Sequence, residues 1–184
     1  MTKIKASKYA VPFLWAAVFA YGVRCLYLFY MQSVQPLDYN NRYFQSDLPY
    51  HISMIVDDGW YYSFTAYIYQ FLHWLGGCST MPIAIFLAAV AVLSIVLTDK
   101  LLQLLLDRRQ TQWMTLGAAF ALNLAMPFFW RLAGEYRYVS YQSGNLWHNS
   151  TYQCMKLAAL AAMLFYEKAQ VSYRQRLSLR QWLL

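Results

Sequence analysis

The chain has 184 residues, of which 60% are hydrophobic, 19% are aromatic and only 12% are charged. Soluble domains carry roughly 25% charged residues, so this composition argues against a soluble globular core and favours a membrane protein. The net charge of +7 does not indicate nucleic-acid binding, because the basic residues flank apolar stretches instead of forming one solvated face.

Four stretches are apolar enough to be membrane-spanning helices, which need about 20 predominantly apolar residues. They are residues 9–31, 81–97, 113–130 and 151–166. The first follows a basic start, but it exceeds the apolar core of about 7 to 15 residues in a signal peptide and lacks a small-residue cleavage pattern. The sequence therefore predicts an all-α, polytopic membrane domain with four spans.

Basic residues orient these spans, because Lys and Arg concentrate in short loops on the cytoplasmic side. They cluster before the first span, between the second and third, and after the fourth. With four spans, all three clusters lie on one side, so both termini are predicted to be cytoplasmic and segments 32–80 and 131–150 to face outward. The sequence from Tyr173 onward resembles a basic loop leading into another apolar segment. We therefore expect residues 1–184 to be the front part of a larger protein, or one subunit of an assembly.

The first outer segment is much longer than the connections of about 2 to 8 residues that usually join packed helices. Ser46 as N-cap, with Asp47 and Pro49 in the first turn, predicts a short helix that ends near Val56. A second helix is predicted over Trp60–Leu75, where the many aromatic residues suit a position in the membrane interface. Two juxtamembrane helices are thus expected at the outer surface.

Acidic residues are scarce, and four of the eight lie in this outer segment: Asp38, Asp47, Asp57 and Asp58. Asp47 is either a helix-start residue or a catalytic carboxylate. His51 lies one turn after Asp47, so the pair can share a helix face and take part in acid–base chemistry or metal binding. Two groups make a weak metal site, so no metal is predicted. Hydrogen bonding at the interface is the simpler role for His51.

The second outer segment carries positive charge on the outward side, against the usual bias. Arg131 and Glu135 have helical spacing and can pair in the headgroup region. Alternatively, Arg131 and Arg137, with His148 in the same segment, can hold a phosphate group, since Arg donates two parallel hydrogen bonds. Both interpretations stay open from the residues alone.

Polar residues inside the predicted spans need partners, because hydrocarbon offers none. Lys156 lies near the outer end of the fourth span and is expected to snorkel to the interface or to find a partner. Arg24 lies deeper in the first span and invites an acidic group or a lipid phosphate. Asn123 and Pro127 in the third span are predicted to bend or bridge helices.

Two segments carry a resemblance to a known family: Phe44-Gln-Ser-Asp-Leu-Pro-Tyr-His-Ile and Gly144-Asn-Leu-Trp-His-Asn-Ser-Thr-Tyr-Gln-Cys-Met-Lys. The chain resembles the beginning of bacterial multispanning proteins with the glycosyltransferase-C (GT-C) architecture. That class has a first span, then a long extracytoplasmic loop with two juxtamembrane helices, then further spans. The resemblance covers most of this chain but only the front part of such a protein.

The resemblance also implies roles for individual residues. In that class an Asp of the first outer loop acts as the catalytic base, and the sugar donor hangs from a polyprenyl phosphate in the membrane. Asp47 occupies the matching position, with Asp38, Asp57 and Asp58 as less favoured substitutes. The candidates for holding the substrate are His51, Arg131, Arg137, His148 and Lys156.

We therefore expect a membrane glycosyltransferase module that transfers a sugar from a polyprenyl-phosphate donor to a cell-envelope acceptor, on the extracytoplasmic side of a bacterial inner or plasma membrane. The expected partners are membrane lipid, the lipid-linked sugar and a further membrane domain or subunit, and no cofactor is expected. One alternative is a non-catalytic small membrane subunit or scaffold that binds partner helices or lipid. A third is a transporter or flippase fragment, for which only Asn123 and Arg24 supply polar groups in the spans.

Overall fold

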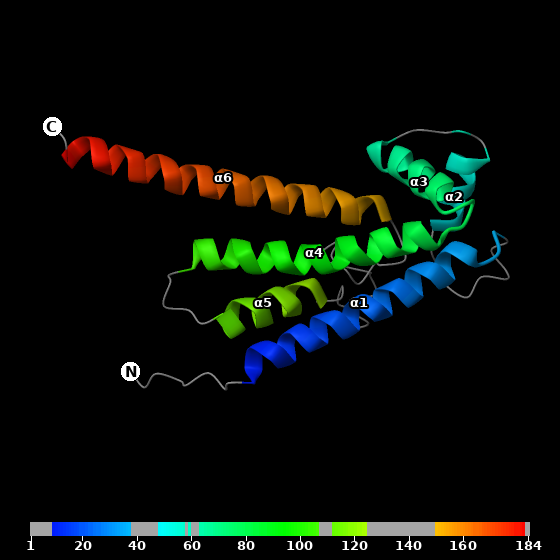
Figure 1. Ribbon diagram of the computed structural model, residues 1–184, viewed down its shortest axis with the longest axis horizontal. Coiled ribbons are helices and arrows are strands. Elements are labelled where there is room, and N and C mark those ends of the chain that lie inside the picture. Colours follow the sequence, from blue (N-terminus) through cyan, green and yellow to red (C-terminus); the bar gives the residue numbers. More distant parts are fainter. Residues whose placement is uncertain are drawn as a thin grey trace, which may run out of the picture.

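The structure, a computed structural model, describes residues 9–37, 48–57, 59, 63–106, 112–124 and 150–182, with the side chains of the last segment described from 153 to 173. Within these ranges the chain forms α-helices and no strand, which confirms the all-α prediction for this part (Figure 1). The helices are α1 (Ala10–Val34), α2 (Leu48–Val56), α3 (Phe64–Leu75), α4 (Met81–Leu105), α5 (Gln112–Leu124) and α6 (Ser150–Trp182).

Two helices, α1 and α4, are long and apolar enough to cross a membrane. Each has 25 residues, which makes it about 37 Å long, more than the hydrocarbon thickness of about 30 Å. Both keep large apolar side chains on the molecular surface: Phe13 and Phe19 of α1 are 73% and 74% exposed, and Leu93 of α4 is 47% exposed. Such a surface is stable against lipid and costly against water.

The other two predicted spans are not supported by this test. In the described part of the chain, two helices rather than four are both long enough and apolar enough to cross a membrane. Helix α5 begins as predicted for span 113–130, but residues 125–130 lie outside the described residues. Helix α6 begins as predicted and then continues to Trp182. The loop predicted from Tyr173 is therefore wrong. No Gly or Pro interrupts α6, and its Ala, Leu, Lys, Arg and Gln residues all favour helix.

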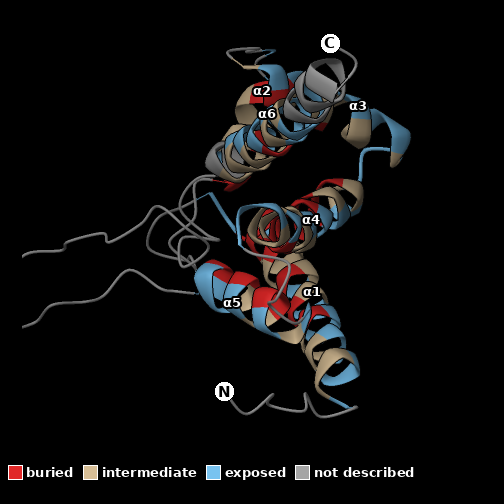
Figure 2. Ribbon diagram, turned by 90° about the vertical axis from the view of Figure 1, so that its left-hand side faces the viewer, coloured by how far each residue is buried: buried red, intermediate tan, exposed pale blue. Residues whose placement is uncertain are grey.

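Helix α4 lies at the centre of the bundle, with α1, α5 and α6 packed around it (Figures 1 and 2). Its buried apolar residues fall on one broad side of the helix, as packing on three neighbours requires: Ile83, Ala84, Leu87, Ala88, Val90, Ala91 and Ile95. Gly22 lets α1 approach closely, because a Cβ atom at that position would lie 2.9 Å from Cγ2 of Val92. The rings of Tyr21 and Phe120 meet edge to face at 6.0 Å and join α1 to α5.

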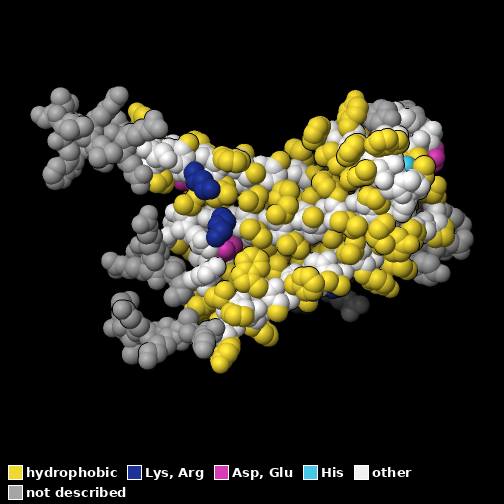
Figure 3. Space-filling model, in the orientation of Figure 1, with side chains coloured by type: hydrophobic (Ala, Val, Ile, Leu, Met, Phe, Trp, Pro, Cys, Tyr) yellow, Lys and Arg dark blue, Asp and Glu magenta, His cyan; other side chains and the backbone are white. Residues whose placement is uncertain are grey.

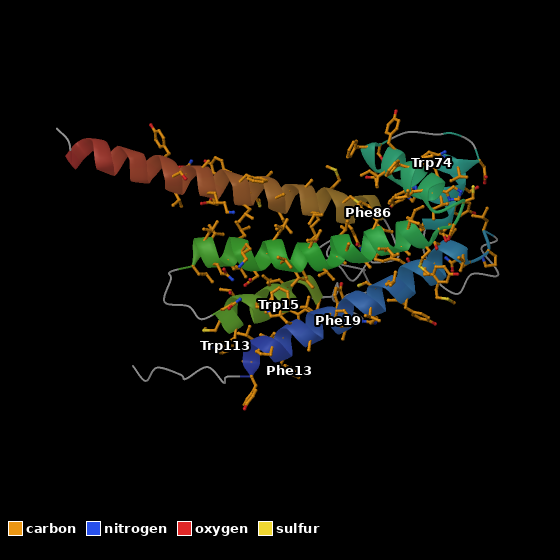
Figure 4. The ribbon with its side chains drawn as sticks, in the orientation of Figure 1. Phe13, Trp15, Phe19, Trp74, Phe86 and Trp113 are labelled. Atoms are coloured by element: carbon orange, nitrogen blue, oxygen red, sulfur yellow. The ribbon has the colours of Figure 1, made fainter. Side chains whose placement is uncertain are left out.

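Helices α2 and α3 lie at one end of this bundle, beside the end of α1 and the start of α4 (Figure 1). The predicted helix end at Val56 is confirmed, whereas the second helix begins at Phe64, and residues 60–62 lie outside the described residues. In α3 the buried Tyr69 ring meets Phe86 of α4 at 6.5 Å. The other side of α3 exposes aromatic rings, including that of Trp74 (Figure 4): Phe64, Tyr67, Phe71 and Trp74.

The start of α1 and the end of α4 lie at the opposite end of the bundle, and α6 runs past this end (Figure 1). Lys100 stands near the end of α4 and Lys168 in the second half of α6, and Figure 3 shows basic side chains where these helices reach that end. Lys100 and Lys168 thus lie toward the end of the bundle opposite to the α2–α3 pair.

The close approach of α1 and α4 can be tested by giving Gly22 a side chain. We expect Gly22→Ala to lower the free energy of unfolding by about 1 to 3 kcal/mol relative to Gly117→Ala, because the added methyl group overlaps Val92. Gly117→Ala is the matched control, since the nearest atom to its added Cβ is 3.8 Å away, an ordinary contact. Unfolding in detergent micelles measures both, and equal stability of the two variants would contradict the packing.

Candidate functional site

Two of the six predicted site residues lie in the described part of the chain, His51 in α2 and Lys156 in α6. The remaining four lie outside the described residues: Asp47, Arg131, Arg137 and His148. Asp47 directly precedes Leu48, the first residue of α2. The roles of these four residues stay predictions.

His51 stands half-buried in α2, a nine-residue helix that packs against α1 and α3. Pro49 falls in the first turn, where a missing N–H is tolerated. At the other end of the helix, the Ser53 hydroxyl donates a hydrogen bond of 2.7 Å to Asp57 Oδ2. That contact lies within one turn of the chain and gives the Asp57 carboxylate a local partner.

A short polar contact joins α1 and α4 near α2 and α3. The hydroxyls of Ser33, near the end of α1, and Thr80, at the start of α4, form a hydrogen bond 2.8 Å long. This bond ties the end of α1 to the start of α4 beside the α2–α3 pair.

A second polar cluster joins three helices inside the bundle. Lys156 Nζ of α6 donates to Asn123 Oδ1 of α5 at 2.7 Å. Asn123 Nδ2 donates in turn to Thr98 Oγ1 of α4 at 3.2 Å and to the Ala119 carbonyl at 2.8 Å. Both N–H groups and the oxygen of the Asn123 amide therefore have partners. We call Lys156, Asn123 and Thr98 the three-helix junction.

The junction decides between the two expectations for Lys156, snorkelling or a partner. The ammonium reaches into the bundle and donates a hydrogen bond to Asn123, which is 3% exposed. The physical reason is that the Asn123 amide donates to Thr98 of α4 and to the Ala119 carbonyl of α5. Its oxygen is then available to accept a hydrogen bond from a cation. The prediction that Asn123 bridges helices is confirmed. Lys156 hydrogen-bonds to α5. The helix that carries His51, α2, instead packs against α1 and α3.

Asp99 is a candidate that sequence reasoning missed. Its side chain is 1% exposed, one oxygen accepts a 2.7 Å hydrogen bond from Gln103 Nε2, and the other oxygen is buried with no hydrogen-bond partner. The predicted span ended at Leu97, which placed Asp99 in a loop. The helix continues to Leu105, so the signal was available: an acid within an apolar helix is a functional candidate.

The junction offers one kind of chemistry, a cation held inside an apolar bundle. An ammonium has three N–H donors, and among the described residues Asn123 is the partner that accepts from Lys156. The other two N–H donors of the Lys156 ammonium suit an oxygen-rich or anionic group. In the part of the chain that the structure describes, no three His, Cys, Asp or Glu side chains gather as metal ligands.

Comparison with protein-family models gives no match, and comparisons with curated proteins and with solved structures give none either.

The three-helix junction can be tested with a double-mutant cycle. We expect Asn123→Leu to lower the free energy of unfolding by about 1 to 3 kcal/mol, because it leaves the Lys156 ammonium and Thr98 without their partner. Adding Lys156→Met should recover much of that loss, since removing both polar partners removes the unpaired charge. Unfolding in micelles measures the coupling. Strictly additive effects of the two substitutions would show that the side chains do not interact.

Proposed function

We propose that this chain is a membrane glycosyltransferase module that transfers a sugar from a polyprenyl-phosphate donor to a cell-envelope acceptor on the extracytoplasmic side. The observation that carries the proposal is the order and placement of the first helices. A long apolar helix, α1, is followed by two short helices packed at one end of the bundle, and a second long apolar helix, α4, returns. This is the order expected from the resemblance to GT-C proteins.

The placement of α2 and α3 supports a reaction at a membrane surface. Helix α3 joins α4 through a short turn at residues 76–80, so it stands level with the end of a helix that can span the bilayer. The exposed aromatic face of α3, with Trp74 and Tyr67, suits the headgroup layer. A lipid-linked substrate presents its phosphate and sugar at that same level.

In this proposal Asp47 is the base that takes the proton of the acceptor hydroxyl. The leaving phosphate needs cations, for which Arg131, Arg137 and His148 are the outer candidates. Lys156 belongs to this set only if a phosphate oxygen reaches the three-helix junction. Its ammonium can hold such an oxygen and Asn123 at once, because it carries three donors.

The proposal includes four spans with both termini in the cytoplasm. Helices α5 and α6 serve as the third and fourth spans, and both pack against α4. The basic residues at the ends of α4 and α6 then face the cytoplasm, as the positive-inside rule expects.

A second candidate is a non-catalytic scaffold, and one observation favours it. Helix α6 exposes small residues on its surface, among them Ala158, Ala159 and Ala162. Small residues allow close packing of a neighbouring membrane helix. A stable complex that tolerates loss of every outer acid would support this scaffold over the transferase.

The transferase proposal is tested by removing the base. We expect Asp47→Asn to reduce sugar transfer roughly 10²- to 10⁴-fold, the usual contribution of a general base, while membrane insertion is unchanged. The assay measures transfer of radiolabelled sugar from a polyprenyl-phosphate donor in membranes of cells that produce the native chain or the variant.

Asp57→Asn is the matched control, because this acid is exposed and bonded within its own turn. We expect that variant to keep near-normal transfer. Near-normal transfer by Asp47→Asn would exclude Asp47 as the base.

A further inference from the structure

Arg24 is an exposed cation within the apolar helix α1. It lies 14 residues after Ala10 and ten residues before Val34, which is roughly 21 Å and 15 Å from the two helix ends. Among the described residues, no carboxylate lies within ion-pair distance of its guanidinium. The contrast with Lys156 is direct, since Lys156 points into the bundle and has a partner there.

Arg24 is poorly placed to reach the membrane surface. Side chains of an α-helix lean toward its N-terminus, so Arg24 leans away from the nearer end at Val34. The end toward which it leans is the more distant one, roughly 21 Å away. Neither direction lets the guanidinium leave the hydrocarbon by snorkelling alone, and a charge that stays there needs a partner.

The surface around Arg24 has the form of a helix-packing seam. Phe13, Ala16, Ala20 and Tyr27 recur with Arg24 at intervals of three or four residues, and all five are exposed. The two alanines allow another backbone to approach closely, and the larger residues flank that approach. The opposite side of α1, with Val18 and Cys25, is already buried in the bundle.

A second copy of this chain is a poor source of the missing acid within its described residues. Asp99 is 1% exposed inside its own bundle. Asp57 follows α2 at the outer end of the molecule, and Glu167 lies beside Lys168 in the polar second half of α6. The described residues of this chain therefore offer no counter-charge for Arg24, and a helix of a different protein is the source that we consider.

We propose that the seam of Phe13, Ala16, Ala20, Arg24 and Tyr27 on α1 is the docking surface for a transmembrane helix that carries an Asp or Glu near its midpoint. The partner's carboxylate pairs with the Arg24 guanidinium, for which a bidentate arrangement is available. Its small or medium side chains pack over Ala16 and Ala20. The proposal does not depend on sugar transfer, and it applies equally to a catalytic module and to a scaffold.

The experiment uses two synthetic transmembrane peptides of Leu and Ala, one with a single Glu at its centre and one with Gln there. Resonance energy transfer from a dye on the exposed Cys78 to a dye on the peptide measures association in phosphatidylcholine vesicles. We expect the Glu peptide to associate roughly tenfold more tightly than the Gln peptide, and Arg24→Gln to remove that difference.

Two further variants separate the seam from general effects on the fold. Ala20→Leu should weaken binding of the Glu peptide because it blocks close approach, whereas Leu93→Ala, on the exposed surface of α4, should leave it unchanged. Equal binding of the Glu and Gln peptides to the native chain would overturn the proposal and favour lipid phosphate as the partner of Arg24. A preference for Glu that survives Arg24→Gln would overturn it as well.

Discussion

The need to remove two long apolar helices from water is the constraint on which the rest of the structure depends. Helices α1 and α4 pack against each other through Gly22 and Val92, but that contact covers only one side of α1. Phe13, Phe19 and Tyr27 remain exposed on its other side. A hydrocarbon environment removes the cost of that exposure. It then imposes its own condition, because every polar group inside it must find a partner.

The polar side chains within the bundle meet this condition to different degrees. Asn123 is fully satisfied and ties α4, α5 and α6 together through Thr98 and Lys156. Asp99 is satisfied at one oxygen only, and Arg24 has no carboxylate partner within the described residues. The first case fixes how α4, α5 and α6 pack. The other two are polar groups that the described residues leave without a full set of partners.

Sequence patterns were sufficient for features that depend on local chemistry. The apolar stretches predicted helices α1 and α4, and the turn residues Asp57-Asp58-Gly59 placed the end of the next helix near Val56. The loop prediction from Tyr173 failed because basic and polar residues continue a helix as well as they form a loop. The partner of Lys156 could not be predicted, for a different reason. Its partner Asn123 is 33 residues away, and no local pattern reveals which helix faces another.

The same limit applies to the candidate site, whose proposed base and outer cations come from segments far apart in the chain. The account rests on α2 and α3 lying at the outer membrane surface, and one native residue tests this. Cys78 is exposed in the turn between α3 and α4, while Cys25 is buried and Cys154 is partly buried. The account predicts that a membrane-impermeant maleimide labels the chain in intact cells and that Cys78→Ser abolishes the labelling. Labelling of Cys78 only after the membrane is permeabilised would contradict it.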